Sequence, residues 1–216
     1  MLRHRAIVAM LLLPLLSGPL PATGQEAGPT ALPTPQLEKV GPLMAALQAR
    51  RTCRSFSDRP LPRQELANLL WAAFGVNRSR SGKRTAPSAR NWQEIDIYIA
   101  SASGLFRHDA IGHRLEPIRN KDLRALTGRQ SFAADAPVTL IYVADLKKMT
   151  GAPQDRLDFY IGADTGFIAQ NVYLYCAAAG LATGVRADID RQALAKAMGL
   201  RPEQRITLAQ SVGYRL

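Results

Sequence analysis

The longest regular stretch of this 216-residue chain runs from Leu157 to Ala179 and ends at Gly180. Between Thr165 and Val185 it holds no charged residue, so a helix here has no charged face to offer to water. A membrane-spanning helix needs about 20 predominantly apolar residues, and the adjacent Gln170–Asn171 pair at mid-span argues against one. The pattern predicts a long central helix that is buried nearly all round, with the fold built around it.

Helical and strand-like patterns alternate along the rest of the chain. Apolar spacing predicts helices that begin at Gln36, cover 63–74 up to Gly75, cover 121–127, and lie within 188–200 with a cap near Asp190. Alternating or continuous apolar runs predict strands over 94–100, 137–144 and 206–212, and a hairpin or extended excursion over 104–118. This order is typical of an α+β or α/β fold with an antiparallel or mixed sheet.

Residues 1–24 have the organisation of a secretory signal peptide. Arg3 and Arg5 form a basic start, Ile7–Leu16 is apolar, and Ala22–Gly24 offers the small residues of a cleavage site. An uncleaved membrane anchor is the alternative, although the apolar run is short for a span. The sequence therefore predicts an exported protein, periplasmic or secreted, with no stable membrane insertion after cleavage.

The remaining chain divides into a leader and one domain. Residues 25–35 are rich in Pro, Gly, Thr and Ala, with little to bury, and are predicted to be a flexible leader. Residues 36–216 are enough for one substantial core and marginal for two, so they are predicted to form a single domain.

Charge and cysteine content narrow the function classes. Lysine and arginine number 28 against 17 acidic residues, which gives a net charge of +11 and favours anionic partners. No basic run is interleaved with aromatic residues, so nucleic-acid binding is not predicted. Cys53 and Cys176 have no neighbouring His or Cys and are predicted to be free thiols rather than metal ligands; no metal site is expected.

Arg50-Arg51-Thr52-Cys53-Arg54 is a compact candidate for binding phosphate. Guanidinium groups bind phosphate oxygens in a bidentate manner, and here three of them lie within five residues around a threonine. A solvated helix terminus, where arginine complements the helix dipole, is the alternative.

The stretch from Lys83 to Gln93 has the period of neither helix nor strand. Pro87 followed by Ser88 is typical of a helix start, where free backbone N–H groups bind anions. Asn91 and Gln93 carry donors and acceptors that suit the edge of a heterocycle. A surface loop that begins a helix is the alternative.

These two segments, in this order, resemble the nitroreductase-like flavoprotein family. The resemblance extends to nearly all of the chain after the leader, through shared features at Phe56, Pro60-Leu61, Gly128-x-Gln130, Ala178–Leu181 and Val212–Tyr214. It implies an α+β fold with a mixed, mainly antiparallel sheet surrounded by helices, a long buried central helix and, as usual in the family, an intertwined homodimer. It also implies FMN as the cofactor.

The resemblance carries cofactor roles to particular residues. Phosphate and ribityl contacts fall on Arg50, Arg51, Thr52 and Arg54. Contacts with the flavin ring, near the neighbouring subunit, fall on Pro87, Ser88, Ala89 and Asn91, with Gln93 a weaker transfer. Gln130 corresponds to a position whose amide contacts the isoalloxazine, and Val185, Arg186 and Ala187 to a turn whose backbone lies near the reactive N5 edge.

Two departures from the family pattern concern this site. Members often carry Glu-Gly or Gly-Gly where this chain has Arg186-Ala187, so the chemistry on the substrate side is expected to differ. Many members also extend past the last strand with a basic residue that reaches the FMN phosphate, and Arg215 is the candidate here.

The resemblance implies an FMN-dependent oxidoreductase of nitroreductase type that works by ping-pong hydride transfer through flavin N5, to or from a small organic substrate. The flavin carries the chemistry; no catalytic residue is assigned, although Arg186 is a hypothesis for polarising a substrate. Two alternatives stay open. One is an azoline-type heterocycle dehydrogenase, the subgroup that the Leu69–Gly75 helix and the short spacing from Arg50 to Gln93 favour. The other is a non-catalytic binding protein for flavin or another anionic nucleotide. The electron donor, NAD(P)H or another, is left open by the export signal.

Overall fold

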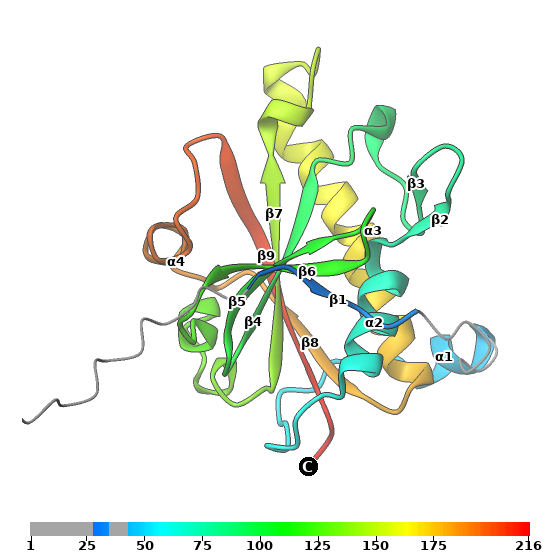
Figure 1. Cartoon of the computed structure of the whole chain (residues 1–216), viewed down its shortest axis with the longest axis vertical. Coiled ribbons are helices and arrows are strands. Elements are labelled where there is room, and N and C mark those ends of the chain that lie inside the picture. The colour runs from blue at the N-terminus through cyan, green and yellow to red at the C-terminus, as the bar shows by residue number, and fades with distance from the viewer. Residues whose placement is uncertain (1–27, 35–42) are drawn as a thin grey trace, which may run out of the picture.

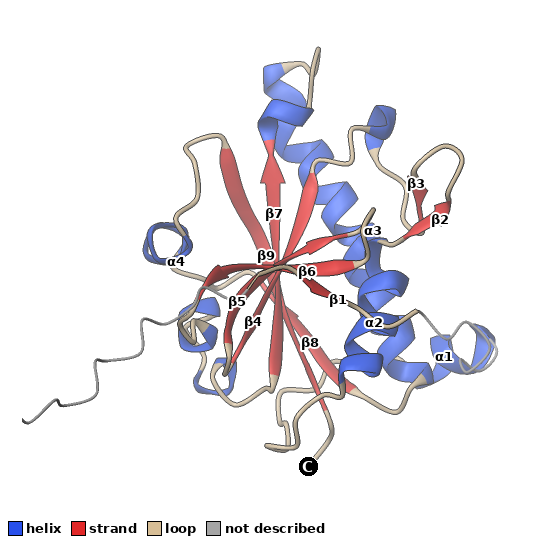
Figure 2. Cartoon of the chain, viewed as in Figure 1, coloured by secondary structure: helices blue, strands red, loops and turns tan. Residues whose placement is uncertain are grey.

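The computed structural model describes residues 28–34 and 43–216. The predicted signal peptide and the start of the helix predicted at Gln36 lie outside these residues. The described part is a mainly antiparallel α+β fold, as the sequence predicts (Figure 1, Figure 2). Its helices are α1 (Leu43–Ala49), α2 (Arg63–Phe74), α3 (Leu157–Ala178) and α4 (Arg191–Met198).

One seven-stranded sheet runs through the molecule in the order β1-β6-β5-β4-β7-β9-β8, and every neighbouring pair is antiparallel. Its strands are β1 (Thr30–Ala31), β4 (Ile95–Ser101), β5 (Gly104–Asp109), β6 (Arg114–Arg119), β7 (Val138–Asp145), β8 (Ala182–Arg186) and β9 (Gln204–Gly213). A separate hairpin pairs β2 (Val76–Arg78) with β3 (Lys83–Arg84).

The two faces of the sheet support two different cores. Ile97 and Tyr142 point into the larger core, beneath α2 and α3. Tyr98 and Ile141, one position away on the same strands, point into a smaller core that includes residues of α4. Because β7 is covered on both faces, all eight of its residues are buried, which explains its nearly continuous apolar run.

The long helix confirms the predicted element, with one correction to its burial. Ile168, Val172 and Cys176 are 0% exposed, so one side of α3 is core. The opposite side bears Phe159 and Phe167, which are 68% and 47% exposed. The helix is therefore buried on one face rather than nearly all round. Within residues 28–34 and 43–216, no helix has both the length and the apolarity needed to cross a bilayer.

Three further expectations are corrected. Residues 28–34 of the predicted flexible leader contain β1, which pairs with β6 and places the buried Leu32 against the core. The predicted 121–127 helix is a 3-10 turn over Arg124–Thr127. Val185 and Arg186, which the resemblance assigns to a turn with Ala187, instead end the edge strand β8. An edge strand of five residues with little apolar alternation gives a weak sequence signal.

A buried polar chain joins the middle strands to the edge strand. The Tyr142 hydroxyl donates to Gln210 Oε1 at 2.6 Å, and Gln210 Nε2 donates to Thr183 Oγ1 at 3.1 Å. All three residues are at most 2% exposed. Each of these three side chains has a buried hydrogen-bond partner, so the contacts fix the register of β7, β9 and β8 as well as adding stability.

Tyr142→Phe is expected to lower the free energy of unfolding by about 1–3 kcal/mol, because it leaves Gln210 Oε1 buried without a donor. Urea denaturation measures the change. Tyr160→Phe is the matched control, since its phenol makes no hydrogen bond within the described part of the chain. Equal losses for the two variants would contradict the role given to the buried chain.

Candidate functional site

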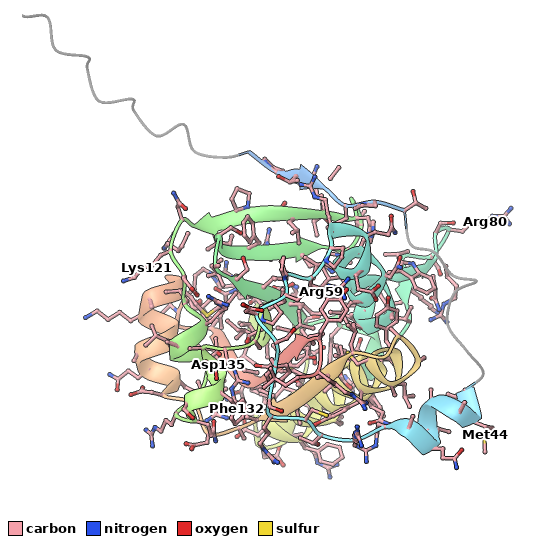
Figure 3. The ribbon with its side chains drawn as sticks, turned by 90° about the horizontal axis from the view of Figure 1, so that it is seen from below. Met44, Arg59, Arg80, Lys121, Phe132 and Asp135 are labelled. Carbon is pink, nitrogen blue, oxygen red and sulfur yellow. The ribbon has the colours of Figure 1, made fainter. Side chains whose placement is uncertain are left out.

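The segment Arg50–Arg54 lies along the edge strand β8. The Cys53 amide donates to the Thr183 carbonyl at 2.8 Å. A Cβ atom at Gly184 would stand 2.5 Å from the Cys53 carbonyl oxygen, so only glycine lets the segment approach this closely. Figure 3 shows the chain running from α1 along the lower side of the molecule to Phe132 and then turning upward past Asp135 to Arg59.

Tyr173 of α3 ties this segment to β8. Its hydroxyl lies 2.9 Å from Thr52 Oγ1 and accepts the Val185 amide at 3.1 Å. The Arg50 guanidinium lies 5.4 Å from the centre of the Tyr173 ring. The structure therefore brings together predicted residues from two distant parts of the sequence, through a tyrosine that the sequence did not single out.

The arginines of this segment have no carboxylate partner within the described part of the chain. Arg51 and Arg54 are exposed and Arg50 is half-buried. No carboxylate of the described residues forms an ion pair with any of them. Three unpaired guanidinium groups in one short segment are well suited to bind a phosphate.

Gln130 lies just beyond the Arg186 end of β8. Its Nε2 donates to Asp188 Oδ2 at 3.2 Å, while its buried Oε1 has no partner among the described residues. The Arg129 amide also donates to the Asp188 carbonyl, at 3.1 Å. A Cβ at Gly128 would approach Arg186 Nε to 2.4 Å, so glycine is needed for the turn to pack here. The orphaned acceptor of Gln130 fits a ligand that presents an N–H group.

Arg186 is 6% exposed and its guanidinium is used inside the protein. It donates to the Thr127 carbonyl at 2.8 Å, to Ser211 Oγ at 2.8 Å and to the Thr127 hydroxyl. Burial lowers the pKa of Arg186 to about 10, so it keeps its charge at neutral pH. This geometry does not support the hypothesis that Arg186 polarises a substrate. On either side of it, Val185 is half-buried and Ala187 is exposed.

The Pro87–Asn91 segment also contacts α3, but at a different place from the Arg50–Arg54 segment. The Ala89 amide donates to Asp164 Oδ2 at 2.9 Å. At 1.5 Å per residue, Asp164 and Tyr173 are about 14 Å apart along α3. One chain therefore does not bring Pro87, Ser88, Ala89 and Asn91 to the Arg50–Arg54 segment.

The helix start predicted at Pro87-Ser88 is a single 3-10 turn over Ala89–Asn91. Its Ala89 amide, expected to be free for an anion, is taken by the carboxylate of Asp164. The Ser88 hydroxyl accepts the Gln93 amide at 2.9 Å, and Arg84 Nε donates to Gln93 Oε1 at 2.8 Å. Gln93 thus forms hydrogen bonds within the segment and with its neighbour Arg84 instead of facing a ligand.

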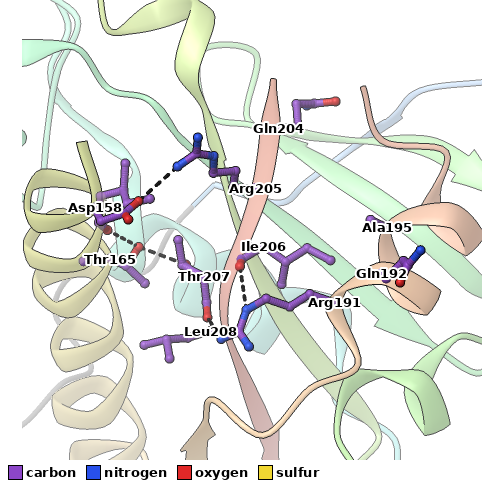
Figure 4. Close-up of a pocket in the computed structure, with 12 residues that line it drawn as sticks. Asp158, Thr165, Arg191, Gln192, Ala195, Gln204, Arg205, Ile206, Thr207 and Leu208 are labelled. Atoms are coloured by element: carbon purple, nitrogen blue, oxygen red, sulfur yellow. Dashed lines mark hydrogen bonds and ion pairs between the residues drawn. The ribbon is translucent and has the colours of Figure 1, made fainter. Parts of the chain in front are cut away.

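A pocket of about 550 Å³ opens between α3, α4 and the first half of β9 (Figure 4). Arg191 closes one wall by donating to the Ile206 and Thr207 carbonyls at 3.0 and 2.8 Å. Arg205 Nη1 donates to Asp158 Oδ1 at 3.0 Å across its mouth. None of the predicted cofactor residues lines this pocket, and its arginines are already engaged, so we do not assign the cofactor to it.

Sequence reasoning missed Tyr173, Asp188 and Asp164. Each acts through a contact with a residue distant in sequence, and none belongs to a local motif. Within the described residues, no cluster of three or more His, Cys, Asp or Glu side chains is arranged to hold a metal ion, and Cys53 and Cys176 are both free.

Comparison with known proteins places this geometry in a family. Residues 47–214 match the model of the nitroreductase family. A solved structure of a nitroreductase from Ralstonia eutropha is similar with a TM-score of 0.85 and 41% identity, over 92% of this chain and 96% of that one. A Methanocaldococcus jannaschii protein named as a nitroreductase is 31% identical over 159 residues, 69% of this chain and 79% of its own length. The FMN reductase [NAD(P)H] of Bacillus subtilis is 24% identical over 142 residues, 66% of this chain and 47% of its own. The fold, the matched residues and these relatives agree: the chain belongs to the nitroreductase family, a family of flavin oxidoreductases.

Proposed function

We propose that this protein is an FMN-dependent oxidoreductase that transfers hydride to or from a small organic substrate by a ping-pong mechanism. The observation that carries the proposal is the unpaired cluster Arg50, Arg51 and Arg54, held against β8 beside the Tyr173 hydroxyl. A phosphate at one end and a ring with N–H groups at the other match the arginines and the orphaned Gln130 acceptor.

The residues of the chain would bind and orient the cofactor. Arg50, Arg51 and Arg54 would hold the phosphate, and Thr52, fixed by Tyr173, would contact the ribityl chain. The Gln130 amide and the backbone of Val185–Ala187 would contact the ring edge. When bound, FMN supplies hydride transfer; the protein supplies position and electrostatics. Behind the Val185–Ala187 backbone, the Arg186 guanidinium holds Thr127 and Ser211 in place through its hydrogen bonds.

The ring-lining role of Pro87, Ser88, Ala89 and Asn91 requires a second copy of the chain. In one copy this segment is separated along α3 from the arginines, so we propose that it reaches the cofactor of its partner in a homodimer. The exposed stripe of α3 supports this proposal. Phe159 and Phe167 are exposed there, and a Cβ at Gly162 or Gly166 would meet no atom within 4 Å, which leaves the surface open to close packing.

Two further parts of the proposal rest on the sequence. Export follows from the signal-like residues 1–24, and it leaves the electron donor open between NAD(P)H and another reductant. The azoline-type dehydrogenase and the non-catalytic flavin or nucleotide binder remain alternatives. No residue described here favours either over a reductase of the family type.

Arg51→Glu is expected to weaken FMN binding by at least about tenfold, since one charge-assisted contact is lost and repulsion of the phosphate replaces it. Equilibrium dialysis or flavin fluorescence measures the dissociation constant. Arg80→Glu, the same charge reversal on the exposed β2–β3 turn (Figure 3), is the matched control and should bind as the parent does. Unchanged binding in Arg51→Glu would remove the phosphate assignment, and a parent that takes up no FMN would overturn the proposed function.

Phe167→Glu is expected to convert the dimer to monomer, because it places a charge in the exposed stripe of α3. Light scattering after size exclusion gives the mass. Ile111→Glu is the matched control and should stay dimeric. Ile111 lies in the turn between β5 and β6 and is 84% exposed. A monomeric parent would contradict the dimer proposal.

Anaerobic addition of NADPH or NADH is expected to bleach the bound FMN at the absorbance of the oxidised flavin, and an added quinone or nitroaromatic acceptor should restore it. If the protein retains FMN but no reductant bleaches it, the non-catalytic binder becomes the better reading.

A further inference from the structure

Glu94 is a fully buried acid without a donor. It lies between the Pro87–Gln93 segment and β4, and it is 0% exposed. No other residue in the described part of the chain donates a hydrogen bond to either of its carboxylate oxygens. A charged carboxylate in such a place carries the full cost of lost hydration, so the neutral acid is strongly favoured.

The group against Glu94 is a second carboxyl, that of Asp164 on α3, which is 2% exposed. Two carboxylates form a hydrogen bond only when a proton lies between them. Asp164 Oδ2 already accepts the Ala89 amide at 2.9 Å, whereas both Glu94 oxygens lie buried without a partner from another residue. We therefore place the shared proton on Glu94, as the donor to Asp164.

The electrostatic surroundings agree with this distribution. Burial raises the pKa of Glu94 to about 7; the backbone amide of Glu94 itself opposes this rise, and the charge of Asp164 adds to it. Lys148 is the other ionisable group that faces Glu94, and it lowers this pKa as the smallest contribution. Its amine is paired with Asp96 at 2.6 Å, so it is not a dedicated partner of Glu94.

The segment held by Asp164 needs its anchors. Arg90, Asn91 and Gln93 have φ angles of 50°, 57° and 50°, in the left-handed region that residues with a side chain rarely adopt. Such a conformation persists only where surrounding contacts enforce it. The Ala89–Asp164 hydrogen bond joins this strained turn to α3, as does the edge-on contact between the Trp92 and Tyr160 rings, whose centroids are 5.4 Å apart.

We propose that Glu94 and Asp164 share one proton and act as positioning residues for the Pro87–Gln93 segment, with Asp164 holding the Ala89 amide and Glu94 donating to Asp164. Removal of this proton at rising pH places two negative charges together in a dry site. The carboxyls then separate, and the hold on Ala89 weakens. The consequence for FMN rests on the proposed function, whereas the sharing of the proton does not.

Trp92 gives a readout that needs no cofactor. The chain has two tryptophans, Trp71 and Trp92, and the second lies inside the segment, where its Nε1 donates to the Thr150 carbonyl at 3.2 Å. In a Trp71→Phe background, the emission of Trp92 is expected to shift with a midpoint near the Glu94 pKa of about 7. Glu94→Gln keeps a neutral donor in place and should abolish the shift. Asp164→Asn removes the like charge and should also abolish it. A shift that persists in both variants, or no shift in the parent, overturns the proposal.

FMN affinity tests the consequence. The ratio of the FMN dissociation constant of the parent to that of Glu94→Gln is expected to rise with pH above about 7, by up to about tenfold per pH unit, the limit for one linked proton. The ratio cancels the ionisation of the FMN phosphate, which both proteins experience alike. A ratio that is constant with pH overturns the positioning role. If neither protein binds FMN, the proposed function fails, and the Trp92 titration still decides whether the proton is shared.

Discussion

The packing of α3 against the sheet is the constraint on which the candidate site depends. One face of this helix is sealed into the larger core by Ile168, Val172 and Cys176, so its position along the sheet is fixed. Two polar residues on this helix, Asp164 and Tyr173, are then fixed as well. Tyr173 receives Thr52 and the Val185 amide, and Asp164 receives the Ala89 amide. Both halves of the proposed cofactor cradle are thus set by one apolar contact surface.

The polar groups behind β8 and those beside the proposed cofactor site differ in whether they have partners. Around Arg186 and Gln210, buried polar groups are satisfied by Thr127, Ser211 and Tyr142, which makes the wall behind β8 rigid. At Arg50–Arg54 the guanidinium groups are left without carboxylate partners, and at Gln130 one acceptor is left without a donor. A folded chain seldom leaves buried polar groups unmatched, and a bound ligand is one of the reasons why it does. We use this contrast to distinguish residues with a structural role, such as Arg186 and Gln210, from the candidate ligand-binding residues Arg50–Arg54 and Gln130.

Local motifs pointed to candidate site residues but not to their arrangement. Arg50–Arg54 could be proposed from the sequence because phosphate binding requires guanidinium groups at short spacing, whereas Gln130 was proposed only from the family resemblance. The bounds of α2 and the existence of β4, β7 and β9 followed from apolar periodicity. Arg186 was misjudged because its sequence position gives no sign that Thr127 and Ser211 would engage its guanidinium. β1 was missed because two residues in a Pro- and Gly-rich leader pair with β6 through backbone groups, which any sequence can offer.

The sequence by itself determined the class of fold, the family and the residue types available for a phosphate and a ring. These depend on composition and short-range spacing, which the sequence displays directly. Only the tertiary structure decided that Pro87–Asn91 and Arg50–Arg54 lie apart on α3, and that Glu94 meets Asp164 in a buried place. Such contacts join residues far apart in the chain. They arise from how apolar faces pack, and that packing sets distances and dielectric surroundings that no local pattern records.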